Sequence, residues 1–208
     1  MVTVYWGINT NTRKAAFWML NYILHEPDLY QILCDEVQAV FIDGAETPDH
    51  PTLLEQCPRL NAAWDETIRM SAFSASVRHV LEDTVVGGKL LRKGSRLMIP
   101  YRQLHFDQSV FGPGIDQFQS ERFLKDKTLK RGGSWRPFGG GTTQCPGRFA
   151  AKLVVLSFIA TLFKRFHVEI DGPQKDPEPQ LGKPVLGIVA SKGDLRVRVT
   201  PRTMPNKS

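Results

Sequence analysis

The chain has 208 residues, of which 41% are hydrophobic and 23% charged, a composition typical of a folded globular protein and not of a disordered one. Its longest apolar run, 153–163, is shorter than the roughly 18 residues that a membrane span needs, and no basic stretch followed by an apolar one opens the sequence as a signal peptide would. Three widely spaced cysteines fit neither a disulfide framework nor a zinc site, and the formal net charge of +6 lacks the interleaved aromatic residues typical of nucleic-acid binding.

The first 71 residues carry helical periodicity. Apolar side chains recur at helical spacing over 4–25 and again over 27–40, and each segment is expected to form a helix. Thr52 and Glu55 then form a T-x-x-E capping box, which predicts the start of a short helix. A further helix is expected over 58–71. Residues 43–51, which are rich in Asp, Gly and Pro, are expected to form a loop, and the rest of this part of the chain is expected to be helical.

The periodicity changes after residue 76. Segments 77–86 and 89–99 are expected to form two strands, because Gly87 and Gly88 between them are a strong signal for a hairpin turn. Residues 101–144 contain short helical pieces and much irregular chain. Together with the helices, these features predict a mainly α fold with small β-hairpins.

A last long helix is expected to begin just after Pro146. Its predicted buried face carries five apolar residues at helical spacing: Phe149, Leu153, Leu156, Ala160 and Phe163. The segment 185–199 is expected to form a terminal hairpin. At the other end, the helical pattern is already in progress at residue 1 without a capping residue, which suggests that part of the domain precedes this sequence.

The segment 138–147, with the sequence FGGGTTQCPG, has the strongest chemical signal in the chain. Cys145 is expected at or next to the N-cap of the last helix, where free backbone N–H groups and the helix dipole favour a thiolate. Three glycines allow the backbone to approach a large flat ligand, and such a thiolate can ligate haem iron. Judged by this loop alone, a buried structural cysteine is an equally good interpretation. A phosphate-binding loop is excluded because the Lys-Ser/Thr ending is absent.

Four residues of this loop match F-x-x-G-x-x-x-C-x-G, the haem-binding signature of the cytochrome P-450 superfamily: Phe138, Gly141, Cys145 and Gly147. The sequence therefore resembles that family. The resemblance implies that Cys145 is the axial ligand of the iron in haem b, iron protoporphyrin IX, and that the other three residues shape the cofactor-binding loop.

Two further signatures support the resemblance. Glu66 and Arg69 match E-x-x-R on a helix, where a spacing of three places both side chains on one face. Arg122 belongs to the E-R-F motif at 121–123. The resemblance implies a structural triad of Glu66, Arg69 and Arg122 that fixes the loop beneath the haem. Without it, Glu66 and Arg69 would be interpreted as an exposed helical ion pair.

The first helix departs from the pattern of most members of the family. Thr10 stands in place of the usual acid, and Asn11 in place of the usual first threonine, which leaves Asn11 and Thr12 as the candidate catalytic residues. Asn followed by Thr, after Trp6, resembles the branch that contains steroid 7α-hydroxylases and prostacyclin synthases. In that branch Leu186 and Ile188 would face the substrate. The alternative is that the polar residues at 9–11 only face solvent.

Arg78 matches the position of a family arginine that binds a haem propionate. Thr143, two residues before the cysteine, can donate a hydrogen bond but supplies no charge where arginine or histidine is common. His79 and His105 are interpreted as structural. Seven basic residues lie within 20 positions of Cys145 and are expected on the face that would dock an acidic reductase, or else on an ordinary solvated surface: Lys125, Lys127, Lys130, Arg131, Arg136, Arg148 and Lys152.

The resemblance covers almost all of 1–208 and implies the C-terminal part of an incomplete cytochrome P-450 fold, from the second half of the distal helix to the terminal hairpin. It implies an oxidoreductase that hydroxylates a lipophilic substrate (a sterol, fatty acid or terpenoid-like molecule) with O2 and electrons from an NADPH-dependent flavoprotein reductase. The full-length protein would lie on the cytosolic face of the endoplasmic reticulum membrane, anchored through the missing N-terminal part. The alternatives are a peroxide isomerase or dehydratase of the prostacyclin synthase type, and a truncated non-catalytic product.

Overall fold

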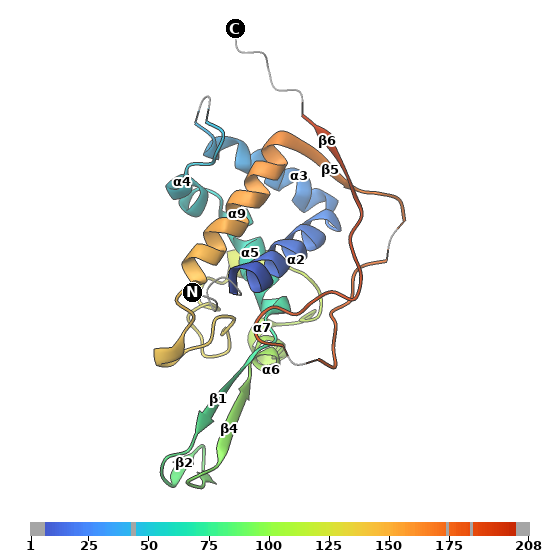
Figure 1. The fold of residues 1–208 in the computed structure, drawn as a ribbon. Helices are drawn as coiled ribbons and strands as arrows, with labels where there is room; N and C mark the ends of the chain where they lie inside the picture. Colours follow the sequence, from blue (N-terminus) through green and yellow to red (C-terminus); the bar gives the residue numbers. More distant parts are fainter. Residues whose placement is uncertain (1–6, 43–44, 174, 184, 203–208) are drawn as a thin grey trace.

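The computed structural model describes residues 7–42, 45–173, 175–183 and 185–202. Figure 1 shows a helical body with small two-stranded sheets, so the predicted fold class is confirmed. The helices are α2 (Arg13–Leu24), α3 (Pro27–Glu36), α4 (His50–Glu55), α5 (Pro58–Ser71), α6 (Tyr101–His105), α7 (Gln108–Phe111), α8 (Glu121–Lys125) and α9 (Arg148–Arg165). A π-helical turn, Ile8–Thr12, leads into α2, and two short 3-10 turns lie at Val37–Val40 and Gly141–Thr143. The predicted start of the first helix at residues 4–6 lies outside the described residues.

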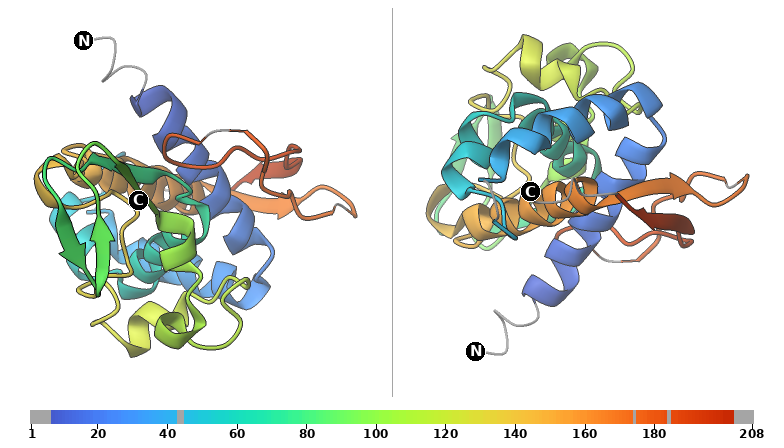
Figure 2. Two further views of the ribbon diagram at one scale, coloured as in Figure 1. Left: turned by 90° about the horizontal axis from the view of Figure 1, so that it is seen from below. Right: turned by 90° about the horizontal axis from the view of Figure 1, so that it is seen from above.

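The core lies where α2, α5 and α9 pack against one another. Seen from above, α9 crosses over α2 (Figure 2), and both helices contact α5. Trp18 of α2, Trp64 of α5 and Phe163 of α9 are almost fully buried there. The ring of Phe138 stacks on that of Trp64 at 6.5 Å between centroids. The same core therefore anchors the loop that precedes α9.

A carboxylate caps the short helix α4. Asp49 Oδ2 accepts hydrogen bonds from the backbone N of Thr52 at 3.0 Å and from its hydroxyl at 2.6 Å. Aspartate is a favoured N-cap because its carboxylate satisfies a backbone N–H that has no partner within the helix. The predicted capping box of Thr52 and Glu55 is therefore wrong, since the helix begins at His50 and Thr52 lies within its first turn.

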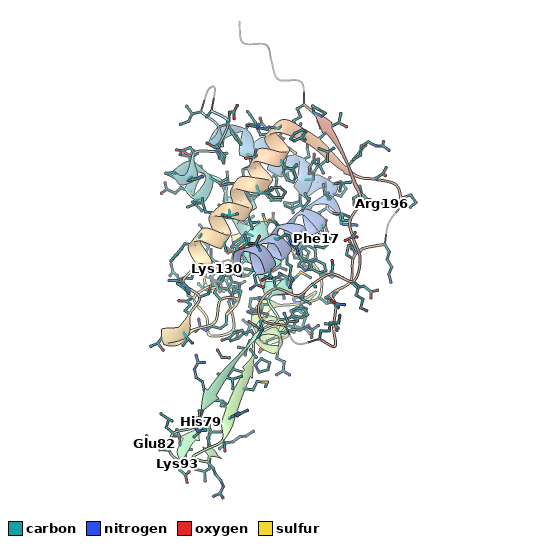
Figure 3. All side chains as sticks on the ribbon, viewed as in Figure 1. Phe17, His79, Glu82, Lys93, Lys130 and Arg196 are labelled. Carbon is teal, nitrogen blue, oxygen red and sulfur yellow. The ribbon has the colours of Figure 1, made fainter. Side chains whose placement is uncertain are left out.

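The hairpin predicted around Gly87 and Gly88 is present, in two consecutive ladders. Strand β1 (Ala75–His79) pairs with β4 (Arg96–Pro100), and β2 (Thr84–Val86) pairs with β3 (Lys89–Leu91). Gly87 and Gly88 have φ angles of +56° and +74°, which suit the tight turn that joins two antiparallel strands. The hairpin projects from the helical body, and Figure 3 shows His79 on it, well away from Lys130. His79 is exposed there, and its structural role stays a prediction.

The C-terminal part of the chain pairs differently from the prediction. Strand β6 (Val197–Pro201) pairs antiparallel with β5 (Phe166–Ile170), which directly follows α9. The hairpin predicted over 185–199 is therefore wrong. Residues before β6 instead make isolated bridges, and one of these joins Ile188 to Ala72 at the end of α5. Residues 187–189 of this segment instead contact the end of α5, more than 100 positions earlier in the chain.

Helix α9 begins just after Pro146, as predicted, with Gly147 as its N-cap. Cys145 lies two residues before this cap, so its predicted place at or next to the N-cap is wrong. Phe149 was expected on the buried face, but its side chain is 71% exposed, whereas Leu156 and Phe163 on that face are fully buried. Among the described residues, no helix is both long enough and apolar enough to cross a membrane.

Candidate functional site

The three cysteines have different environments. Cys34 and Cys57 are buried, and Cys145 is exposed. Burial raises the pKa of the Cys57 thiol to about 12 and also raises that of Cys34, so both remain protonated at neutral pH. No group of three or more His, Cys, Asp or Glu side chains in the described part of the chain could hold a metal ion. Of the three cysteines, Cys145 is therefore the one whose thiol is accessible.

The loop that leads to Cys145 is fixed by its own backbone. Cys145 N donates a hydrogen bond to Phe138 O at 3.0 Å, which closes the loop between them. Gly139 and Gly141 have φ angles of +78° and +65°, a left-handed conformation that favours glycine. A Cβ on Gly139 would lie 3.3 Å from the hydroxyl of Tyr101, whereas one on Gly141 would meet nothing within 4 Å. The backbone at Gly141 is thus open to an approaching ligand.

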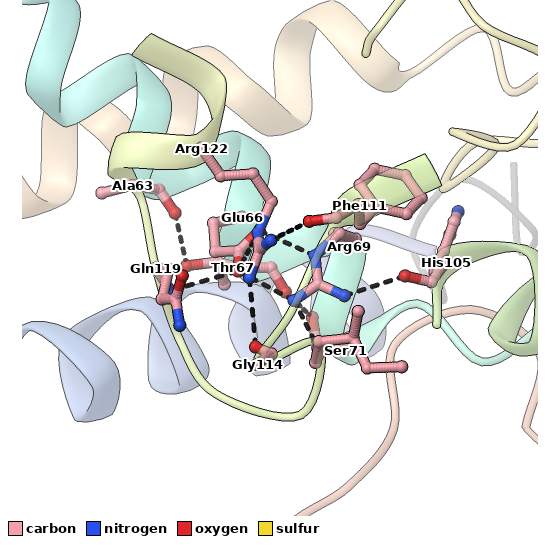
Figure 4. Close-up of polar contacts among 11 residues, drawn as sticks. Ala63, Glu66, Thr67, Arg69, Ser71, His105, Phe111, Gly114, Gln119 and Arg122 are labelled. Atoms are coloured by element: carbon pink, nitrogen blue, oxygen red, sulfur yellow. Dashed lines mark hydrogen bonds and ion pairs between the residues drawn. The ribbon is translucent and has the colours of Figure 1, made fainter. Parts of the chain in front are cut away.

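Glu66, Arg69 and Arg122 lie together (Figure 4). Arg69 binds Glu66 through two parallel hydrogen bonds of 2.7 and 2.8 Å, and Arg122 Nε lies 3.3 Å from Glu66 Oε1. The side chains of Glu66 and Arg69 have no exposed area, and that of Arg122 is 7% exposed. The pair is therefore not the exposed helical ion pair that was the alternative.

The two guanidinium groups also bind backbone carbonyls of the irregular region 105–115. Arg69 donates to His105 O at 2.8 Å and to Ile115 O at 2.9 Å. Arg122 donates to Gly114 O at 3.1 Å and to Phe111 O. Because buried charges are stable only when they are fully hydrogen-bonded, these contacts hold the irregular chain against α5.

His105 links this network to the loop of Cys145. Its ring Nε2 accepts a hydrogen bond of 2.9 Å from the backbone N of Arg136, two residues before Phe138. The ring is fully buried, and this burial, with the charge of Arg69 nearby, lowers the pKa of His105 to about 4. The neutral ring is therefore the form that holds the loop. The hydrogen bond from Arg136 N is the contact through which His105 acts as a structural residue.

Two arginines lie beside a hollow next to the loop. Arg78 Nη2 donates to Thr143 Oγ1 at 2.7 Å. The Arg78 guanidinium therefore lies next to Thr143, the uncharged residue that stands where arginine or histidine is common. A hollow of about 290 Å³ is lined by residues of β1, β4, α6 and the glycine loop, among them Arg78, Arg136 and Gly141. An exposed thiol, an open glycine backbone and two cations fit a flat group that carries carboxylates. The residues present therefore fit haem.

Asn11 contacts the two residues predicted to face the substrate. Its Nδ2 donates to Leu186 O at 3.3 Å, and its Oδ1 accepts from Ile188 N at 3.1 Å. The side chain of Leu186 is 74% exposed, whereas Ile188 is 8% exposed. All three line a hollow of about 210 Å³ beside the π-helical turn. Thr12, the other candidate, is half-buried on the same turn.

The basic residues near Cys145 are unequal. Four of them are exposed, namely Lys125, Lys127, Lys130 and Arg131. The other three are half-buried, namely Arg136, Arg148 and Lys152. Lys130 pairs with the buried carboxylate of Asp65 at 2.7 Å, and burial lowers the pKa of Lys152. The exposed charge therefore lies on α8 and the segment that follows it.

Sequence reasoning missed three features of this region. It did not identify Arg136 as a residue that lines the hollow beside the glycine loop, or His105 as the acceptor of a hydrogen bond from the backbone of that loop. It also did not identify the hydrogen-bond partners of Asn11. The side chain of Asn11 reaches across 175 positions to Leu186, and no short motif contains information at that range. The glycine in the partner segment, Gly187, was the available signal, because glycine often marks a close approach of two segments.

Comparison with known proteins gives consistent similarities. A sequence profile of the cytochrome P-450 family matches residues 2–197. The chain is 30% identical to salutaridine synthase of Papaver somniferum, over 99% of this chain and 42% of that protein. It is 34% identical to the cytochrome P-450 monooxygenase poxD of Penicillium oxalicum, over 77% of this chain and 34% of that protein. It is 24% identical to cytochrome P-450 7A1 of Oryctolagus cuniculus, over 95% of this chain and 44% of that protein. The chain thus spans less than half the length of these relatives.

Proposed function

Because the chain belongs to the cytochrome P-450 family, we propose that it is the C-terminal part of a haem-thiolate monooxygenase. In this proposal, 1–208 form one part of a single cytochrome P-450 domain, and Cys145 is the axial ligand of the iron in haem b. The observation that carries the proposal is the exposed Cys145 at the end of a glycine loop, with two buried cysteines elsewhere. When bound, the haem supplies the iron at which one oxygen atom of O2 is transferred to the substrate.

The residues around Cys145 would hold the cofactor. Phe138 anchors the loop in the core, Gly141 and Gly147 leave room for the porphyrin, and Arg78 with Arg136 would bind its carboxylates by charge-assisted hydrogen bonds. Glu66, Arg69 and Arg122 would keep the underlying chain fixed, and a rigid support is what a precise axial ligand needs.

We propose a lipophilic substrate, a sterol, fatty acid or terpenoid-like molecule. The hollow beside Asn11 supports this, because Val185, Leu186, Ile188 and Ala190 give it an apolar wall. Asn11 and Thr12 also support placement in the branch that contains steroid 7α-hydroxylases and prostacyclin synthases, and the similarity to cytochrome P-450 7A1 agrees with that placement. In this proposal Asn11 or Thr12 would hold the water that carries protons.

An NADPH-dependent flavoprotein reductase is the proposed electron donor. The exposed cations Lys125, Lys127 and Arg131 support a face that attracts an acidic partner and raises its association rate. The full-length protein would be held at the endoplasmic reticulum membrane, on its cytosolic face, by a segment outside this chain.

A second candidate is a peroxide isomerase or dehydratase of the prostacyclin synthase type. Thr10 in place of an acid favours it, because isomerisation of a peroxide requires neither electrons nor external protons. A truncated non-catalytic product is the third alternative, since the chain spans 42% of salutaridine synthase.

The test supplies the full-length protein with lipid substrates, with and without NADPH and reductase. A monooxygenase gives NADPH-dependent hydroxylated product from at least one sterol, fatty acid or terpenoid. Full-rate turnover of a hydroperoxide or endoperoxide without electrons, with no NADPH-dependent product, would establish the isomerase instead. Absence of both activities and of any thiolate-type carbonyl spectrum would establish the non-catalytic product.

A further inference from the structure

The segment Leu186–Val189 is bound on two sides. On one side, three residues of a single helical face, Asn11, Lys14 and Trp18, bind its backbone. Lys14 Nζ donates to Ile188 O at 3.3 Å, and Trp18 Nε1 donates to Val189 O at 2.8 Å, in addition to the two bonds of Asn11. The segment therefore has a fixed register along the helix.

On the other side, the end of α5 binds the same segment. Val189 N donates to Ser71 O, and Phe73 N donates to Gly187 O, both at 2.9 Å. These bonds involve the groups of the segment that α2 and its π-turn leave free. With both sides engaged, Leu186 is turned outward at 74% exposure and Val189 inward at 1%.

The backbone of Gly187 lies close to the side chain of Asn11. Its φ angle is +135°, and a Cβ there would lie 2.5 Å from Asn11 Oδ1. Such a contact is shorter than van der Waals contact, so the Asn11 amide can hold this position only with glycine at 187. A carboxamide also has the donor and the acceptor that Leu186 O and Ile188 N need. Aspartate would supply acceptors only, and threonine a single hydroxyl.

We propose that Asn11 is a positioning residue that sets the direction of Leu186 toward the substrate, through the backbone of 186–188. This inference rests on the proposed function and deepens it, because it assigns Asn11 to positioning and leaves Thr12 as the residue that would hold the water. Both amide atoms of Asn11 bind the segment, so its effect on the reaction passes through substrate orientation. The hollow beside it has its apolar wall in Val185 and Leu186, and therefore the hydrocarbon part of a lipophilic substrate is the ligand that Leu186 would orient.

The first experiment measures amide hydrogen exchange over 185–190 in the full-length protein and in Asn11→Ala and Asn11→Asp. Exchange at Ile188 should accelerate roughly tenfold in Asn11→Ala, which corresponds to the loss of one hydrogen bond. Asn11→Asp keeps an acceptor for Ile188 N and should accelerate this exchange less. Val189, whose partner is Ser71 O, should change less in Asn11→Ala than Ile188 does. Unchanged exchange at Ile188 in Asn11→Ala overturns the proposal. This measurement does not depend on turnover, so it separates failure of this inference from failure of the proposed function.

The second experiment measures the ratio of products from one lipophilic substrate. Asn11→Asp and Gly187→Ala should each shift the positional ratio several-fold, with the carbonyl spectrum of the haem retained. Gly193→Ala is the matched control and should leave the ratio unchanged, because a Cβ there meets nothing within 4 Å. Effects of Asn11→Ala and Gly187→Ala should not be additive in the double variant, as is expected for residues in contact. An unchanged product ratio combined with release of peroxide would show that Asn11 acts on proton delivery instead, and would overturn the proposal.

Discussion

Arg78 Nη2 lies 2.7 Å from Thr143 Oγ1, although 65 positions separate the two residues in the chain. This contact joins the base of the projecting hairpin to the loop that ends at Cys145. Thr143 cannot supply a charge at its position, and Arg78 brings a guanidinium to that place. The charge that the loop sequence lacks is therefore provided by a different element.

Arg78→Gln should weaken haem retention in the full-length protein. Hydrogen bonds to a charged group contribute about 1.5–3 kcal/mol, so the rate of haem transfer to an acceptor protein should rise at least tenfold. Arg92→Gln is the control, because Arg92 is exposed on the same hairpin. Equal transfer rates for wild type and Arg78→Gln would remove Arg78 from the cofactor site.

Cys145→Ala should abolish the thiolate-type band of the reduced carbonyl adduct, because no other exposed cysteine can replace the ligand. Cys34→Ala and Cys57→Ala should keep the band at its usual wavelength, since both thiols are buried and protonated. The measurement is the carbonyl difference spectrum, normalised to total haem. Retention of the band in Cys145→Ala would disprove the ligand assignment.

Glu66→Ala and Arg69→Ala should each lower the free energy of unfolding by about 3–5 kcal/mol, because each leaves a buried charge without its main partner. Arg122→Ala should lower it by less, because Glu66 keeps its two hydrogen bonds to Arg69. Haem incorporation should fail as a consequence. Arg59→Ala is the matched control: its ion pair with Glu121, at 2.7 Å, is about half exposed and should contribute less than about 1 kcal/mol. Denaturant unfolding measures the difference. Comparable losses for Arg59→Ala and Arg69→Ala would show that the triad has no special role.

The buried ring of His105 should make stability depend on pH. Its pKa is lowered from 6.5 to about 4 in the folded chain, so below pH 6.5 the unfolded chain binds a proton that the folded chain does not. Stability should fall as the pH decreases from 6.5 to 4, by up to about 3 kcal/mol from this group, and this contribution should level off below pH 4.

His105→Gln provides the comparison for that prediction. The glutamine side chain can accept the hydrogen bond from Arg136 N but does not titrate. The difference in unfolding free energy between wild type and variant should therefore change across pH 6.5–4. A difference that is constant with pH would show that His105 titrates normally in the folded chain.

Several features could be predicted from sequence because their causes are local. Helix α5 has the predicted bounds, since Pro58 suits a first turn and the apolar spacing continues to the end of the helix. The turn at Gly87 and Gly88 was predictable for the same reason. Errors occurred where local signals competed. Asp49 replaced Thr52 as a cap, and Phe149 continued an apolar spacing although its side chain faces outward.

The sequence by itself determined the mainly helical fold class, the family resemblance and Cys145 as the candidate ligand, because these depend on spacing within a dozen residues. Tertiary structure decided which distant segments meet. The pairing of β5 with β6, the contact of Arg78 with Thr143 and the binding of Leu186 by Asn11 join residues at least 27 positions apart. Backbone groups of a strand or loop can bind many partners equally well, and the packing of α2, α5 and α9 selects the partners that lie within reach.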